Sequence, residues 1–327
     1  MRVSSKLFTK LNKTLVQSLS GMVFLINPSV EVIKTDYSNL VDKNLIESPF
    51  EMGNQYFKTP QEIDEFFLST RGIRDKNVKA YFETYKPLML SASNLFKIPY
   101  SFQSCLIFKE SRFNKKAISP VGAMGVAQFT EDTYHFLARA LRIGKSALEA
   151  EGEKMLDAGN FAFVEPDSKK LSYSKYNVKI FGEMHRMWQA YLINNDLEEI
   201  NLSKVSFKKV LYKPEYSIGL SSMYLYYLKH RVKYGIRKYA EEKDLEDPNF
   251  ILSVAGAYNQ GARRVLKALK RDNRKPNFQK WISYQSRIDE TKDYISSIRG
   301  CMKKVVKKAD VDYVSQRHTD TEKSSFN

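Results

Sequence analysis

Residues 102–128 read FQSCLIFKESRFNKKAISPVGAMGVAQ, an apolar run that ends at Glu110 and passes into a segment rich in glycine. The apolar residues before the glutamate favour a buried helix that ends at Glu110. Pro120, Gly122 and Gly125 interrupt regular structure and predict a loop after this helix. The carboxyl group at the junction would therefore lie among apolar neighbours.

Loss of hydration gives Glu110 a candidate chemical role. Burial disfavours the charged form of a carboxyl group and raises its pKa. A carboxylic acid that stays neutral near pH 7 is what general acid catalysis requires. The position alone also fits an ordinary solvated glutamate at a helix end.

The rest of the chain is predicted to be mainly α. The clearest amphipathic stripe runs from Tyr216 to Leu228. No long alternating run predicts a sheet, although one or two strands are expected within residues 152–180. Apolar residues recur at helical spacing in five further ranges: 79–92, 130–149, 181–192, 250–258 and 289–308.

Composition limits the class of protein and of partner. The 327 residues are 43% hydrophobic and 28% charged, which excludes long disorder, collagen and small disulfide scaffolds. The net charge of +16 indicates an acidic partner, such as nucleic acid, anionic lipid or an anionic polymer. From Arg263 to the C-terminus, 17 Lys and Arg residues outnumber 8 Asp and Glu residues. A solvated basic surface is the plainer interpretation of this bias.

The cysteines and histidines predict neither a metal site nor a cofactor. Cys105 and Cys301 lie too far apart in the sequence for a cysteine-based metal site. Two interpretations of them stand: two small buried apolar residues, or one long-range disulfide if the chain is exported. The four histidines are scattered without a zinc-binding spacing.

The termini suggest a domain order. A basic start and the half-apolar run Leu15–Ile26 make residues 1–26 a candidate leader, either a secretory signal or an amphipathic segment. Residues 27–78 then form an N-terminal extension and residues 79–308 the main domain. A polar tail covers residues 309–327.

Four motifs in order point to a known family. Glu110 to Phe113, followed by Ala117 to Gln128, resembles the signature of soluble lytic transglycosylase (SLT) domains, which belong to the goose-type lysozyme superfamily. Three later pieces are similar to further motifs of that family: Tyr216-Ser217-Ile218-Gly219, Ala257-Tyr258-Asn259-Gln260-Gly261 and Glu290-Thr291-Lys292-Asp293-Tyr294. The resemblance implies a lysozyme-like helical domain with a long insertion at about 142–212 and an N-terminal extension.

The resemblance also implies a reaction. Its substrate would be the glycan strand of peptidoglycan, cleaved at the MurNAc-β-1,4-GlcNAc bond. Glu110 would protonate the leaving oxygen and then accept the proton of the muramoyl 6-hydroxyl, with help from the substrate acetamido group. The product would carry a 1,6-anhydro-muramoyl end, unlike that of two-carboxylate hydrolases. No acidic residue follows Glu110 before Glu131, so the loop offers no second carboxylate.

Further site residues are implied one by one. Ser111 and Gln128 would bind the substrate, Tyr258 would direct its hydroxyl toward the acid or the acetamido group, and Asn259 would brace the site. Gly122 and Gly125 would let the backbone approach the sugar. Each polar residue also has a plainer interpretation: a backbone-bonded hydroxyl, a loop-anchoring amide or a packed core tyrosine.

The chain departs from the family in two places. Val126 and Ala127 stand where the family usually has Leu-Met, and Thr130 and Glu131 stand where it often has Met and Pro. The insertion could close over a groove or bind a cell-wall or secretion-machinery protein. Passive packing on the domain is the plainer role for it.

Alternative functions stay open. A water-using muramidase would have the same fold, and a peptidoglycan-binding or assembly protein would have kept the fold without turnover. A nucleic-acid binder is a weaker interpretation because no nucleic-acid motif accompanies the charge, so no specific nucleic acid is expected. A peptidoglycan substrate implies a periplasmic or exported location.

Overall fold

The computed structural model describes residues 22–23, 35–36, 60–69, 73–149, 160–164, 170–237, 248–269 and 290–303. The chain divides into two units, Met1–Pro49 and Phe50–Asn327. In the first unit, β1 (Met22–Val23) pairs antiparallel with β2 (Thr35–Asp36). The rest of the candidate leader and the whole polar tail lie outside the described residues.

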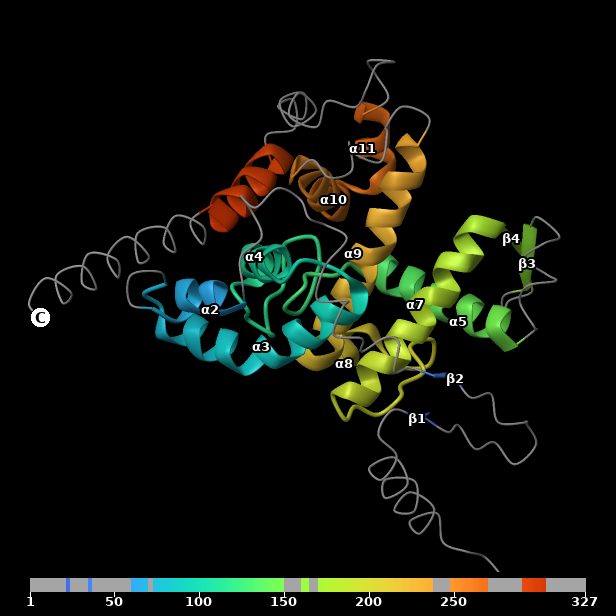
Figure 1. Cartoon of the computed structure of the whole chain (residues 1–327), viewed down its shortest axis with the longest axis horizontal. Helices are drawn as coiled ribbons and strands as arrows, with labels where there is room; N and C mark the ends of the chain where they lie inside the picture. The colour runs from blue at the N-terminus through green and yellow to red at the C-terminus, as the bar shows by residue number, and fades with distance from the viewer. Residues whose placement is uncertain are drawn as a thin grey trace, which may run out of the picture. The chain divides into compact units, whose positions relative to one another are not determined.

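The second unit is mainly α, which confirms the predicted fold class (Figure 1). One antiparallel hairpin, β3 (Asn160–Val164) with β4 (Lys170–Ser174), accounts for the strands expected within residues 152–180. Residues 290–303 form a further helix, drawn in red in Figure 1. The labelled helices of this unit are α2 (Pro60–Leu68), α3 (Lys76–Phe96), α4 (Tyr100–Ser111), α5 (Glu131–Glu149), α7 (Lys175–Asn194), α8 (Phe207–Leu211), α9 (Pro214–Ile236), α10 (Pro248–Gln260) and α11 (Ala262–Leu269).

Local sequence explains where α3 and α4 begin and end. The carboxylate of Asp75 accepts hydrogen bonds from the backbone N–H groups of Asn77 and Val78 and so caps the start of α3. Lys97 ends α3 and Arg112 ends α4, both in the left-handed conformation. The helix predicted to end at Glu110 therefore includes one more residue, Ser111.

Helix α9 lies at the centre of the unit and contacts α3, α7, α8, α10 and α11. Its Gly219 lets α7 approach closely, because an added Cβ would lie 2.3 Å from the ring of Tyr191. Trp188 of α7 is buried in the same contact. Helix α9 is buried on more than the predicted amphipathic stripe, because residues off that stripe, such as Ile218, Ser222 and Leu225, are also buried.

The described part of the insertion packs into this core. Helix α5 continues without a break through residue 142 to Glu149, and α7 packs along it. The hydroxyl of Tyr134 on α5 donates to the carbonyl oxygens of Leu202 and Val205, each at 3.0 Å. Helices α7 and α8 are therefore part of the hydrophobic core.

The structure decides between the two interpretations of the cysteines. Cys105 on α4 and Cys301 in the helix 290–303 form a disulfide, with their Cα atoms 5.8 Å apart. The interpretation as two separate apolar residues was wrong, because sequence patterns carry no information on the distance between them. Among the described residues, no helix has the length and apolarity needed to cross a bilayer.

Candidate active site

The site is built around Glu110, which lies in the last turn of α4. Its side chain is half-buried, so it keeps access to solvent. Burial raises the pKa of this carboxyl group from 4.5 to about 7, against the opposing effects of a hydrogen bond from Tyr294 and of the Lys109 charge. A substantial fraction of Glu110 is therefore a neutral acid at pH 7.

Tyr294 is the hydrogen-bond partner of this acid. Its hydroxyl donates to Oε1 of Glu110 at 2.5 Å from the buried face of the helix 290–303. Burial and the Glu110 carboxylate raise the pKa of Tyr294 well above its ordinary value. Tyr294 thus stays a neutral donor throughout the working range of the acid.

Tyr258 lies near Glu110 but bonds elsewhere. Its hydroxyl donates to the carbonyl oxygen of Ala127 at 2.7 Å. Burial and the Glu110 carboxylate raise the pKa of Tyr258 well above its ordinary value. The ring packs beside Phe129 and Tyr224, with centroid distances of 6.0 and 5.5 Å. Tyr258 therefore braces the loop after α4, while Tyr294 is the residue bonded to the acid.

Ser111 and Gln128 hold the same loop through backbone contacts. The Ser111 hydroxyl donates to the carbonyl oxygen of Val126 at 2.8 Å. The Gln128 amide nitrogen donates to the carbonyl oxygens of Ala117 and Gly125, at 3.0 and 2.8 Å. In this structure Ser111 is thus a backbone-bonded hydroxyl and Gln128 a loop-anchoring amide, which are their plainer interpretations.

The two loop glycines have different surroundings. Gly122 has a φ of +82° and open space where a Cβ would be. Gly125 has a φ of +76°, and an added Cβ would lie 2.2 Å from the carbonyl oxygen of Leu211 in α8. The insertion thus supports the loop directly at Gly125.

The helix that carries Tyr294 is attached to α10 near the site. The Thr291 hydroxyl donates to Oδ1 of Asn259 at 2.8 Å. Asn259 is exposed and follows Tyr258 on α10, so it links two motifs that lie far apart in the sequence. Glu290, at the start of the helix, is exposed.

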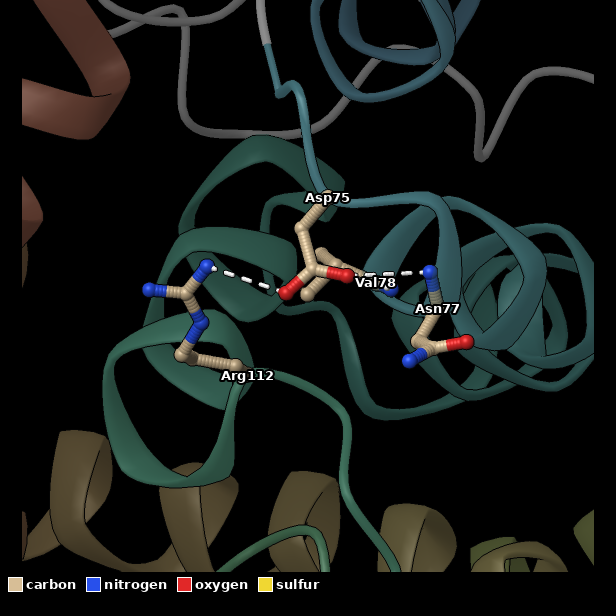
Figure 2. A network of polar contacts seen from close by, with 4 residues as sticks. All are labelled: Asp75, Asn77, Val78 and Arg112. Atoms are coloured by element: carbon tan, nitrogen blue, oxygen red, sulfur yellow. Dashed lines mark hydrogen bonds and ion pairs between the residues drawn. The ribbon is translucent and has the colours of Figure 1, made fainter.

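A polar network joins the start of α3 to the end of α4 (Figure 2). One carboxylate oxygen of Asp75 accepts from Asn77 and Val78 at the start of α3, and the other faces Arg112 at 3.4 Å. Arg112 follows Glu110 by two residues and closes α4. The network therefore ties the turn just after the acid to the start of a neighbouring helix.

This arrangement supplies one acid with one neutral donor. Among the described residues, no second carboxyl group is among the causes of the Glu110 pKa shift. Nor do those residues include a group of three or more His, Cys, Asp or Glu side chains that could hold a metal ion. Chemically, the site can donate a proton and then take one back.

Fold and site together define a helical, lysozyme-like domain with its acid at the end of a buried helix. Residues 87–153 match the family model of the transglycosylase SLT domain, which confirms the resemblance. The match includes Glu110, Ser111 and Gln128, whereas Tyr258 and Tyr294 lie beyond it. An SLT domain implies lytic-transglycosylase-type activity on peptidoglycan in general. A comparison with curated proteins gave no match.

Sequence reasoning missed Tyr294 as the partner of the acid. The sequence places Tyr294 on the inward face of the last predicted helix and at the end of the Glu-Thr-x-x-Tyr motif, but neither pattern pairs it with Glu110. Its position seven residues before Cys301 was the available signal, because a Cys105–Cys301 bond would bring this helix to α4.

Proposed function

We propose that the protein is a lytic transglycosylase that cleaves the MurNAc-β-1,4-GlcNAc bond of peptidoglycan and forms a 1,6-anhydro-muramoyl end. The observation that carries this proposal is the half-buried Glu110, with its pKa raised to about 7 and its hydrogen bond from Tyr294. The SLT match supplies the substrate class.

The proposed reaction needs one carboxyl group in two protonation states. Neutral Glu110 gives its proton to the glycosidic oxygen as the bond to the anomeric carbon breaks, and the substrate acetamido group stabilises the positive charge that develops. The resulting carboxylate takes the proton of the muramoyl 6-hydroxyl, whose oxygen bonds to the anomeric carbon. Glu110 is then neutral again and no water has been consumed.

The alternative chemistry is hydrolysis by a muramidase. An inverting hydrolase needs a second carboxylate to activate water, and a retaining one usually uses it as a nucleophile. The loop from Ser111 to Thr130 contains no acidic residue. This feature of the loop favours the intramolecular reaction.

The site residues divide into two roles. Glu110 is the catalytic residue, and Tyr294 positions its carboxyl group while lowering its pKa. Ser111, Gln128 and Tyr258 hold the loop that would carry substrate-binding backbone groups. Substrate contacts of these side chains and of Asn259 stay predictions.

Location outside the inner membrane is part of the proposal. Peptidoglycan lies there, and the Cys105–Cys301 disulfide favours an oxidising compartment. The net charge of +16 would attract the carboxylates of the muramyl ethers and stem peptides. A protein partner bound through the insertion stays a prediction.

Mass spectrometry of the soluble products from purified sacculi tests the function. We expect products about 18 Da lighter than hydrolytic ones, because no water is added. Glu110→Gln should release none, whereas Glu131→Gln, at the exposed start of α5, should digest normally. Reducing-end products would replace the proposal with a muramidase. Sacculus binding without products from any form would replace it with a binding or assembly role.

A further inference from the structure

The disulfide and the acid–tyrosine bond join the same two helices. Cys105 and Glu110 lie on α4, while Tyr294 and Cys301 lie on the helix 290–303. At about 1.5 Å per residue, the two connections are separated by ~7–10 Å along either helix. Cys105 precedes Glu110 but Cys301 follows Tyr294, so the helices pass each other in opposite directions. The pair is held at two levels, one covalent and one hydrogen-bonded.

Further described contacts attach the helix 290–303 to α10 and to the core. Two side-chain hydrogen bonds run from it to α10, from Thr291 to Asn259 and from Arg299 to Asn249, at 2.8 and 2.7 Å. Both bonds attach the helix to α10, and neither reaches α4. Ile295 and Ile298 are fully buried and would keep the helix in the core if the disulfide were absent.

We propose that the Cys105–Cys301 disulfide is a positioning element, which fixes the helix 290–303 against α4 so that Tyr294 stays bonded to Glu110. The proposal rests on the assignment of Glu110 as the acid. It assigns the two cysteines a role in the reaction itself rather than in stability alone. Without the disulfide, the hydroxyl of Tyr294 would spend less time on Oε1 of Glu110.

The expected consequence concerns the protonation of Glu110. The described groups that act on this carboxyl are Tyr294 from the helix 290–303 and Lys109 from α4. The Glu110 charge acts on Tyr258 of α10, whose hydroxyl bonds Ala127 instead. The Tyr294 hydrogen bond favours the carboxylate and lowers its pKa. Weakening that bond should raise the pKa of Glu110, so the acid would stay protonated to higher pH.

The first test compares four proteins: wild type, Cys105→Ala/Cys301→Ala, Tyr294→Phe and the triple variant. The ¹³C chemical shift of the Glu110 side-chain carboxyl, followed against pH, reports its titration without any need for activity. We expect the disulfide-free protein to titrate at higher pH than wild type, in the same direction as Tyr294→Phe. Adding Tyr294→Phe to the disulfide-free protein should produce a smaller further shift than it does in wild type.

A purely structural disulfide would give a different pattern. The double alanine variant would then lose thermal stability but keep the wild-type titration, and Tyr294→Phe would shift it equally in both backgrounds. That result would overturn the proposal. Val265→Ala, a buried truncation on α11, is the matched control: it should lower stability without moving the titration.

A second measurement covers the case in which the alanine variants do not fold. Dithiothreitol gives two electrons and two protons to the wild-type disulfide, closes to its own cyclic disulfide, and leaves Cys105 and Cys301 as thiols. Folded reduced protein should titrate at higher pH than oxidised protein, and an unchanged titration counts against the proposal. The titration needs no turnover, so it tests the positioning role of the disulfide separately from the proposed function. If sacculus digestion fails but the titration shifts as expected, only the proposed transglycosylase activity is rejected.

Discussion

The hydroxyl of Tyr294 donates to the carboxyl group of Glu110 across 184 positions of sequence. The hydrogen bond lowers the pKa of Glu110, while burial raises it more strongly to a net value of about 7. The acid is therefore poised between its two protonation states near neutral pH. This balance is suited to a group that must donate a proton and then accept one.

The pH dependence of sacculus digestion should follow the titration of Glu110. The first step needs the neutral acid, so the rate of digestion should fall as the pH rises through about 7. Initial rates of product release, measured from pH 5 to pH 9 at constant ionic strength, would show this fall. A rate that stays level to pH 9 would show that another group acts as the acid.

Tyr294→Phe should move the fall in the digestion rate to higher pH. The substitution removes a hydrogen bond that favours the carboxylate, so the pKa of Glu110 rises. Tyr258→Phe is the control, because it removes a hydroxyl that bonds Ala127 instead of Glu110. It should lower the free energy of unfolding by an amount on the order of 1 kcal/mol without changing the pH at which the digestion rate falls. Equal shifts in the two variants would contradict the distinction between the tyrosines.

Glu110→Gln should stabilise the folded protein above neutral pH. The pKa of the folded carboxyl is about 7 and its ordinary value is 4.5. Below pH 4.5 the group is neutral in both states; as the pH rises to 7, only the unfolded chain ionises freely, and this favours unfolding. Because glutamine does not ionise, the free energy of unfolding of this variant at pH 8 should exceed that of wild type by up to about 3 kcal/mol. Thermal unfolding at pH 4 and pH 8 measures the difference, which should vanish at pH 4.

Gly125→Ala should destabilise the protein much more than Gly122→Ala. Both residues have positive φ, and an alanine there costs about 1–2 kcal/mol. At Gly125 the new Cβ would also meet the Leu211 carbonyl oxygen at 2.2 Å, which raises the expected loss to about 3 kcal/mol or more. Denaturant unfolding of both variants gives the comparison, and equal losses would mean that α8 does not press on the loop.

Asp75 should contribute to stability through its cap on α3 rather than through its ion pair. Asp75→Ala removes the acceptor of two backbone N–H groups and should cost about 1 kcal/mol, while Asp75→Asn keeps the cap. Arg112→Ala should cost less than about 0.5 kcal/mol because its side chain is 62% exposed. A larger loss in Arg112→Ala than in Asp75→Ala would reverse this assignment.

The sequence was most informative where chemistry depends on neighbours along the chain. Glu110 ends an apolar helix before a glycine loop, and this local pattern predicts the burial of its carboxyl group. Its catalytic role was inferred from the resemblance to the SLT motif and stays a proposal. The Tyr294–Glu110 bond and the Cys105–Cys301 disulfide join residues 184 and 196 positions apart. No periodicity connects such distant residues, and only the packing of the helix 290–303 on α4 brings them together.

Local pattern also could not give the direction of a side chain. Tyr258 was expected to point toward the acid or the substrate, yet its hydroxyl reaches the Ala127 carbonyl. The insertion could equally have formed a cover over a groove or a packed layer. Its large buried side chains, Trp188 and Tyr191, fit the packed layer that the structure describes.

Three glycines, one of them inside the insertion, contact α7 or α8, and these contacts restrict how the chain can be shortened. Gly125 lies against Leu211, Gly144 against the Phe181 backbone and Gly219 against the Tyr191 ring, so each fits a surface that the insertion supplies. A chain trimmed of α7 and α8 would expose bare backbone at all three positions. A minimal version of this domain would have to be redesigned with new side chains around these positions rather than simply cut out.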